Sequence, residues 1–236
     1  PPAPTSMPDR SGHAAITRTF KPRRRQLSAR RAQLLADGMP RWSLDEAGPV
    51  LDLGAVFGRD GDVVLDIGIG AGNALVALAI AEPHLDVIGC DVHTPGIAAV
   101  LDAIAAHGLT NVRVVHGDVL GFLDRIAPGS LAGVRVWFPD PWPKARQRHR
   151  RLVRHDVVAR LVPLVRAGGW LHLATDIDDY AAQMQRVCDD HPDLTGGPIE
   201  RPAWRPVTRY ESRGLEAGRT VTDLWYARHA ADQSAR

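Results

Sequence analysis

The stretch LDIGIGAGN, residues 65–73, decides the fold of this chain. It places Gly68, Gly70 and Gly72 between an apolar, strand-like run and a segment with helical periodicity. Glycines in such a turn let the backbone bend tightly and let a ligand approach the N–H groups at the start of the helix. A dinucleotide fingerprint would have its third glycine at position 73, where this chain has Asn73, so the turn argues against NAD. A purely structural turn is the alternative.

Around this turn, apolar runs alternate with helix-like segments, which is the rhythm of βαβ units and a parallel sheet. The runs cover residues 63–68, 85–92, 112–118 and 133–140, and the helix-like segments cover 73–82, 96–107 and 119–126. A helix over 149–167, a strand over 170–176 and a helix near 178–190 follow. Two strands at 207–214 and 219–229 would complete a seven-stranded, mostly parallel sheet with helices on both faces and a C-terminal antiparallel hairpin.

Length and composition fit a globular protein with one α/β domain. The chain has 236 residues, of which 44% are hydrophobic and 24% charged, and no apolar run approaches the roughly 18–20 residues that a membrane helix needs. We expect a disordered tail over residues 1–18 and a single domain over 19–236, in which 19–60 form a basic, helical extension. The first residues lack the order of a secretory signal, so we expect a cytoplasmic location and no membrane partner.

Metal and disulfide chemistry have no support in the sequence. Cys90 and Cys188 are far apart, and neither belongs to a CxxC or Cys/His motif. We therefore expect two reduced structural cysteines and no metal ion.

Positive charge is concentrated in two runs, although the net charge is only +2. Residues 18–31 and 144–154 each contain several lysines or arginines and no acid. Such runs are more often solvated helix faces. Two of them in a nearly neutral protein favour a polyanionic partner such as nucleic acid.

An acid follows each of the first three predicted strands. These acids are Asp66, Asp91 and Asp118. Because the carboxyl ends of parallel strands border the ligand crevice, we expect Asp91 to accept from ribose hydroxyls, Asp118 from an adenine amino group, and Asp66 to lie near a cation. Carboxylates would repel a pyrophosphate but suit S-adenosyl-L-methionine, which carries a sulfonium and an ammonium. The alternative for each acid, and most of all for Asp118, is a helix N-cap.

The stretch FPDPWPK, residues 138–144, is stiffened by three prolines. Phe138, Asp140 and Trp142 each precede a proline, which disfavours helical conformations, so we expect all three to be extended. The loop would hold Asp140 and Trp142 near the cofactor. Alternatively, Trp142 is a hydrophobic lid and Asp140 caps the next helix.

Several motifs together resemble one family, the bacterial tRNA (guanine-N7)-methyltransferases. They are the glycine turn, CDVHTPG (90–96), NVRVVHGD (111–118), FPDPWPK followed by RHRRL (138–152), LATD (173–176), and TRYESRG with VTDLWYAR (208–228). The resemblance implies a Rossmann-like, class I S-adenosylmethionine-dependent methyltransferase with tRNA as its partner. Such an enzyme transfers a methyl group to N7 of a guanosine in the tRNA variable loop (tRNA position 46). The sequence leaves open a monomer or a homodimer.

The resemblance also implies roles for individual residues. Contacts with the methyl donor or its pocket would come from Asp66, Asp91, Asp118 and Asp140. Contacts with the substrate would come from Lys144, Asp176, Thr208, Arg209, Tyr210 and Glu211. The basic runs would contact RNA phosphates through Arg23, Arg24, Arg25, Arg146, Arg148, Arg150 and Arg151. The chain departs from the family where Asp66 and Asp91 replace glutamate and where Ala145 interrupts a Lys-Lys pair.

The expected chemistry requires alignment more than proton transfer. Guanine N7 has an in-plane lone pair and no proton, so no general base is needed. Asp140 is the expected catalytic residue, holding the guanine through N1–H and N2–H, and Glu211 is a rival for that contact. Trp142, Trp204 or Tyr210 could stack on an exposed base, and a position in the core is the alternative for each of them. The other readings of the sequence are a methyltransferase with a protein or small-molecule acceptor and a catalytically silent RNA-binding protein.

Overall fold

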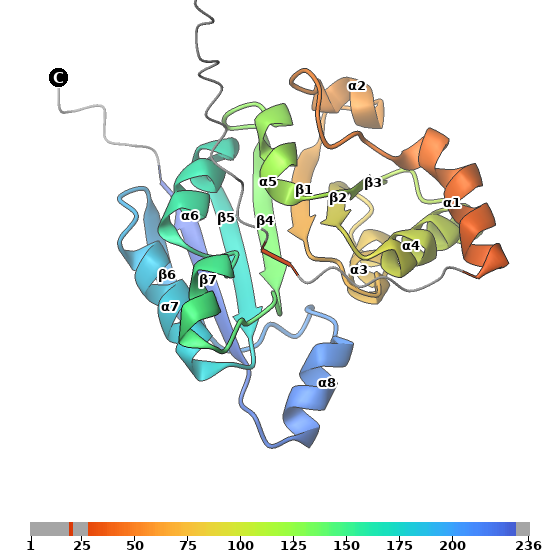
Figure 1. The fold of residues 1–236 in the computed structure, drawn as a ribbon. Helices are drawn as coiled ribbons and strands as arrows, with labels where there is room; N and C mark the ends of the chain where they lie inside the picture. The colour runs from red at the N-terminus through yellow and green to blue at the C-terminus, as the bar shows by residue number, and fades with distance from the viewer. Residues whose placement is uncertain (1–18, 21–27, 230–236) are drawn as a thin grey trace, which may run out of the picture.

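The computed structural model describes residues 19–20 and 28–229 and centres on one seven-stranded sheet (Figure 1). The strand order is β3-β2-β1-β4-β5-β7-β6. The strands are β1 (Asp62–Ile67), β2 (Leu85–Asp91), β3 (Val112–His116), β4 (Leu131–Trp137), β5 (Val165–Thr175), β6 (Leu194–Ile199) and β7 (Thr222–Arg228). Strands β1 to β5 pair in parallel, and β7 runs antiparallel to both β5 and β6. The mostly parallel sheet is therefore confirmed.

Helices cover both faces of the sheet, as expected for βαβ units. One face carries α1 (Ala29–Trp42), α3 (Asn73–Ala81) and α4 (Thr94–His107), which pack on β2 and β3. The other carries α5 (Val119–Phe122), α6 (His155–Leu161) and α7 (Asp178–Asp189). The short elements are α2 (Leu53–Phe57) and three 3₁₀ helices, η1 (Leu123–Arg125), η2 (Ala145–Arg150) and η3 (Val162–Leu164). The helix α8 (Arg209–Glu216) lies apart from both layers, beyond the carboxyl ends of the central strands (Figure 1).

The two faces of the central strands differ in chemistry. On β4, Val134 and Val136 point into the large apolar core that α5, α6 and α7 cover. Arg135 and Trp137 alternate with them and point to the opposite face, as the period of a strand requires. There they meet aromatic and charged side chains, among them Trp170, His172 and Trp204, and Trp137 also packs against Leu78 of α3.

The C-terminal antiparallel pair is confirmed, but its first strand is not the one predicted. Residues 207–214 form most of the helix α8, and β6 (Leu194–Ile199) supplies the strand that pairs with β7. The helix begins at a capping box, in which the Thr208 hydroxyl accepts from the Glu211 N–H and the Glu211 carboxylate accepts from the Thr208 N–H. The spacing of Thr208 and Glu211 is the sequence signature of such a helix start.

The helix predicted over residues 149–167 is also wrong in its bounds. It begins only at His155, and β5 starts at Val165, before the glycine pair that was expected to precede the strand. Gly168 has a φ of 74° there, and the β4–β5 register shifts between Leu131 and Gly133. A glycine in the left-handed region lets the strand continue through this irregularity.

In the part of the chain that the structure describes, no helix is long and apolar enough to cross a membrane. The predicted disordered tail over residues 1–18 lies outside the described residues. Of the N-terminal extension, α1 packs along α4, where Gly38 lies against Leu101.

Candidate functional site

The glycine turn has the left-handed backbone that its sequence predicts. Gly68, Gly70 and Gly72 have φ values of 81°, 59° and 84°. A Cβ at position 72 would lie 2.4 Å from Cγ2 of Val100, whereas a Cβ at position 68 would meet nothing within 4 Å. The turn is therefore tight against α4 on one side and open on the other, at the carboxyl end of β1. Its role in holding a cofactor remains a prediction.

Asp91 ties the glycine turn to the loop after β2. Its two carboxylate oxygens accept from the Gly70 N–H and the His93 N–H, each at 2.7 Å. Nδ1 of His93 also lies 2.9 Å from the Gly70 carbonyl oxygen. Burial raises the pKa of Asp91, and the two N–H groups oppose that rise. Each oxygen keeps a lone pair, so the expected contact with ribose hydroxyls is compatible with this geometry.

Gly96 is a residue of this region that the sequence analysis did not single out as functional. A Cβ at position 96 would lie 1.8 Å from the Gly70 carbonyl oxygen. The start of α4 and the glycine turn are thus in direct backbone contact. Only a glycine permits this approach.

Asp66 is buried on β1, 4% exposed, and faces the same side of the sheet as Arg135 on the neighbouring strand. Burial raises the pKa of Asp66 to about 6, while the positive charge of Arg135 lowers it and the nearby Asp91 raises it. The Asp66 carboxyl group is therefore almost wholly buried. Direct contact of Asp66 with a cofactor remains a prediction.

Asp118 is the N-cap of α5, which was the alternative weighed for it. One carboxylate oxygen accepts from the Leu120 N–H at 3.0 Å. The Asp118 N–H donates to Glu46 from the N-terminal extension, also at 3.0 Å. Burial raises the pKa of Asp118, and the neighbouring charge of Glu46 adds to that rise. A cap engages one oxygen only, so the proposed adenine contact stays open for the other.

The proline-rich loop does not have the extended conformation that its sequence predicts. Phe138 and Trp142 have φ values of 53° and 40°, in the left-handed region. Trp142 is 2% exposed, and its indole N–H donates to the Thr19 carbonyl oxygen at 2.9 Å. Trp142 is therefore a buried side chain, and its predicted stacking on an exposed base is wrong. Asp140 is half-buried, and no side chain caps the next helix, η2, so the capping alternative for Asp140 is also wrong.

The second basic run divides into buried and exposed arginines. Arg151 is 1% exposed and donates to the Pro141 carbonyl oxygen, Asp179 and Gln183 at 2.6–2.8 Å. Its prediction as a phosphate contact is therefore wrong, because three acceptors fix it inside the protein. Arg150 lies over the Trp142 ring at 4.5 Å, and Arg148 pairs with Asp179 at 2.5 Å while staying half-exposed.

Lys144 and Arg146 are both exposed, as their predicted RNA contacts require. The predicted contacts Arg23, Arg24 and Arg25 lie outside the described residues.

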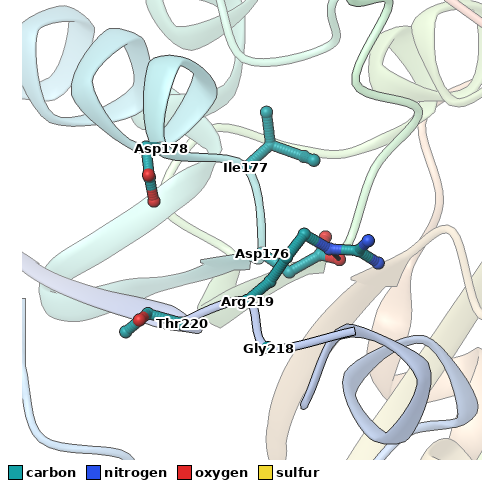
Figure 2. A pocket seen from close by; sticks show the side chains of 6 residues that line it. All are labelled: Asp176, Ile177, Asp178, Gly218, Arg219 and Thr220. Carbon is teal, nitrogen blue, oxygen red and sulfur yellow. Dashed lines mark hydrogen bonds and ion pairs between the residues drawn. The ribbon is translucent and has the colours of Figure 1, made fainter. Parts of the chain in front are cut away.

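A shallow hollow of about 340 Å³ lies at the carboxyl end of β5. This is the same edge of the sheet as the one that bears the glycine turn. Figure 2 shows its lining, from Asp176, Ile177, Asp178, Gly218, Arg219 and Thr220. The Asp176 carboxylate accepts from Arg219 Nε at 2.8 Å, and Asp176 also lies against Gly214 of α8. Asp176 therefore connects β5 to the segment around α8, and its contact with substrate remains a prediction.

The four residues Thr208–Glu211 differ in exposure, because α8 begins within this segment. Glu211 is 1% exposed and paired with Arg201 and Arg205, so its prediction as a guanine contact is wrong. Arg209 and Tyr210 are exposed. Tyr210 Cε2 lies 3.7 Å from the position that a Cβ on Gly70 would take, so α8 reaches the glycine turn.

The sheet order, the glycine turn at the end of β1 and the acid at the end of β2 define a class I S-adenosylmethionine-dependent methyltransferase. Residues 60–224 match the sequence model of a family described as "Putative methyltransferase". A tRNA (guanine-N(7)-)-methyltransferase from Streptomyces avermitilis is 42% identical over 234 residues, 97% of this chain and 81% of that protein. The enzyme of the same name from Chromobacterium violaceum is 39% identical over 215 residues, 89% of this chain and 95% of that protein. The chain belongs to the bacterial tRNA (guanine-N7)-methyltransferase family.

A solved structure supports the fold alone. An rRNA methylase from Streptococcus thermophilus superposes with a TM-score of 0.52 over 72% of this chain and 89% of that one, at 13% sequence identity. At that identity the likeness carries no information about the substrate.

Replacing Gly96 with alanine is expected to displace the glycine turn. The added methyl group would overlap the Gly70 carbonyl oxygen, which is backbone and cannot rotate away. We expect the affinity for S-adenosylhomocysteine, measured by calorimetric titration, to fall by at least about tenfold. The control is Gly108→Ala, with a φ of 63° and open space around it, which should cost about 1 kcal/mol of stability and leave the affinity unchanged. Unchanged affinity in Gly96→Ala would contradict the role of the backbone contact.

Asp66 is expected to make stability pH-dependent. Its pKa is raised from 3.8 to about 6, so the folded state binds more protons between these values, and stability is lost as pH rises through that window. Asp66→Asn should therefore be more stable than the wild type above pH 6, by about 1–3 kcal/mol, and equal to it below pH 4. Urea denaturation at several pH values measures this difference. The exposed Asp60→Asn is the control, and a pH-independent difference for Asp66→Asn would refute the assignment.

Arg151 and Arg146 are expected to differ in how much they contribute to the free energy of unfolding. Arg151→Ala leaves Asp179 and Gln183 without their buried donor, so it should lower the free energy of unfolding by about 2–4 kcal/mol. Arg146→Ala removes an exposed side chain and should stay within about 0.5 kcal/mol of the wild type. Equal urea midpoints for the two variants would contradict the buried role of Arg151.

Proposed function

We propose that this enzyme transfers a methyl group from S-adenosyl-L-methionine to N7 of a guanosine in the variable loop of tRNA. The observation that carries the proposal is the similarity to tRNA (guanine-N(7)-)-methyltransferases, one of which aligns with 97% of this chain. The arrangement of the site supports it. The acidic crevice at the ends of β1, β2 and β3 lies in the same molecule as an exposed basic segment that follows the Asp140 loop.

The residues at the crevice suit the chemistry of the cofactor. Asp91 and Asp118 offer carboxylate oxygens, and Gly68 leaves open space at the turn, where a ligand can approach the backbone. When bound there, S-adenosylmethionine supplies an electrophilic methyl group on a sulfonium. Carboxylates around the crevice favour a ligand of net positive charge over a dinucleotide.

Asp140 is the residue that we assign to the guanine. The rival Glu211 is buried in ion pairs, whereas Asp140 is half-buried on the loop that follows β4. A carboxylate accepts well from two adjacent N–H groups, which guanine offers at N1 and N2. In that position Asp140 holds N7 towards the reacting methyl group and favours the cationic ring that forms. No base is required, since N7 carries no proton.

The exposed cations next to this loop would track the RNA backbone. Lys144 and Arg146 are exposed, and Arg148 is half-exposed although it pairs with Asp179. Contacts of this kind add affinity without reading sequence. Because N7 lies in a deep, narrow groove of helical RNA, the target guanine must come from a loop or leave its stack. A cytoplasmic location and a monomeric or homodimeric state belong to the same proposal.

Asp140→Ala tests the reaction and the role of the loop together. Unmodified tRNA is incubated with the protein and labelled S-adenosylmethionine, digested, and analysed for methylated nucleosides by mass spectrometry. We expect N7-methylguanosine from the wild type and from the control Asp60→Ala, which alters an exposed carboxylate at the opposite end of the sheet. We expect Asp140→Ala to lose at least about 100-fold in rate with little change in tRNA binding. A different methylated nucleoside would overturn the acceptor, and a near wild-type rate would remove Asp140 from the mechanism.

Arg146→Ala tests the RNA path. Losing one phosphate contact should weaken tRNA binding and reduce the slope of log affinity against log salt by about 0.7–0.9. The control is Arg186→Ala, an exposed arginine in the last turn of α7. An unchanged slope in filter binding across several salt concentrations would make the exposed run a plain solvated surface.

A further inference from the structure

The helix α8 has little apolar packing. Its only buried residues are Glu211 and Gly214, and the larger apolar side chains Tyr210 and Leu215 are 46% and 56% exposed. Apolar burial is what usually fixes a short helix against a protein. In α8 that contribution is small, so its position depends mainly on polar contacts.

A buried chain of charged groups supplies those contacts. Arg205 donates from Nη1 and Nη2 to the two carboxylate oxygens of Glu211, at 2.8 and 2.9 Å. The same guanidinium donates to Asp223 of β7 at 3.0 Å, and Nε2 of His172 on β5 lies 2.8 Å from Asp223. Arg201 reaches Glu211 from the outside at 2.7 Å. Arg205 therefore joins the first turn of α8 to the central strands through one planar group.

The charges in this chain balance. Burial lowers the pKa of His172, so the imidazole is neutral and donates to Asp223. Two carboxylates, on Asp223 and Glu211, then face two guanidiniums, on Arg205 and Arg201. A buried ion pair costs desolvation, but removing one member leaves the other charge uncompensated. These buried, paired side chains therefore strongly favour one geometry.

The helix α8, which these charged side chains hold in place, lies over the glycine turn. Glu211 is the third residue of α8, and Tyr210 precedes it. The Tyr210 ring lies against Gly70, with Cε2 3.7 Å from the Cβ position of that glycine. In Figure 1, α8 lies beyond the carboxyl ends of the central strands.

We propose that Arg205 is a positioning residue for the cofactor site. By binding Glu211 and Asp223 at the same time, it fixes α8 so that the Tyr210 ring covers the glycine turn. The inference rests on the proposed function in placing the cofactor at that turn. Arg205 itself touches neither cofactor nor substrate. Its effect reaches the site only through Glu211 and the Tyr210 ring.

The decisive variants are Arg205→Lys, Tyr210→Ala and the combination of the two. Lysine keeps the positive charge but has a single donor nitrogen. It therefore cannot hydrogen-bond the two Glu211 oxygens and Asp223 at the same time in the geometry of the guanidinium. Tyr210 is exposed, so its truncation should leave the fold intact. The control is Arg59→Lys, because Arg59 makes the same kind of two-pronged contact with the buried carboxylate of Asp86, at the opposite end of the sheet.

The affinity for S-adenosylhomocysteine is measured by calorimetric titration, and the unfolding midpoint of each variant is measured in parallel. We expect Arg205→Lys and Tyr210→Ala each to weaken binding by about tenfold, and the double variant to bind no more weakly than Tyr210→Ala alone. Arg59→Lys should lower the unfolding midpoint without changing the affinity.

Three results would overturn the inference: unchanged affinity in Arg205→Lys, unchanged affinity in Tyr210→Ala, or fully additive losses in the double variant. A weakening in Arg59→Lys as large as that in Arg205→Lys would also overturn it, by making the effect one of general stability. If the wild type itself fails to bind S-adenosylhomocysteine, the proposed cofactor site fails, and the role of Arg205 fails with it.

Discussion

The rest of the site depends on the two hydrogen bonds that the Asp91 carboxylate accepts. They join the loop after β1 to the loop after β2, and the His93 ring adds a third contact with the same glycine. With the loops held so close, the start of α4 touches the glycine turn backbone to backbone at Gly96. The spacing of these two loops is thus set by backbone contact and by one carboxylate. A site of this kind is organised before any ligand arrives.

The two faces of the central sheet differ in chemistry, because one is apolar and the other carries buried charged and polar side chains. The face under α5, α6 and α7 is almost wholly apolar and supplies most of the hydrophobic core. The opposite face of β4, β5 and β7 bears Arg135, His172 and Asp223 among tryptophans, and most of these polar groups are fully buried. Apolar packing is tolerant of small shifts, whereas paired charges have few acceptable geometries. The polar face of the sheet is therefore the one with the stricter geometry.

The sequence was sufficient for the parallel sheet and for the glycine turn. Continuous apolar runs of strand length and a glycine cluster at a strand end leave few other structures open. It was insufficient for Arg151 and Glu211, because a charged residue in a polar segment carries no sign of burial until its partners are known, and those partners lie elsewhere in the chain. The helix α8 was within reach: Thr208 and Glu211 have capping-box spacing, which a reading of the segment as a strand passed over.

The loop prediction failed for a different reason. The residue before a proline avoids the right-handed helical region, and this preference predicts an extended chain. Phe138 and Trp142 instead adopt positive φ, where the Phe138 N–H bonds the Ala174 carbonyl oxygen and the Trp142 indole bonds Thr19. Those contacts compensate for a conformation that a local rule disfavours.

The strand order has a consequence for the newly made chain on the ribosome. Strand β7 lies between β5 and β6 although it is the last strand in the chain, so β6 has no place in the sheet until β7 emerges. Until then β5 presents an open edge, and Arg205 lacks the aspartate on β7 that it binds. Synthesis therefore proceeds from end to end before the crevice is covered, and a chain that stops short of β7 exposes an edge strand that invites aggregation.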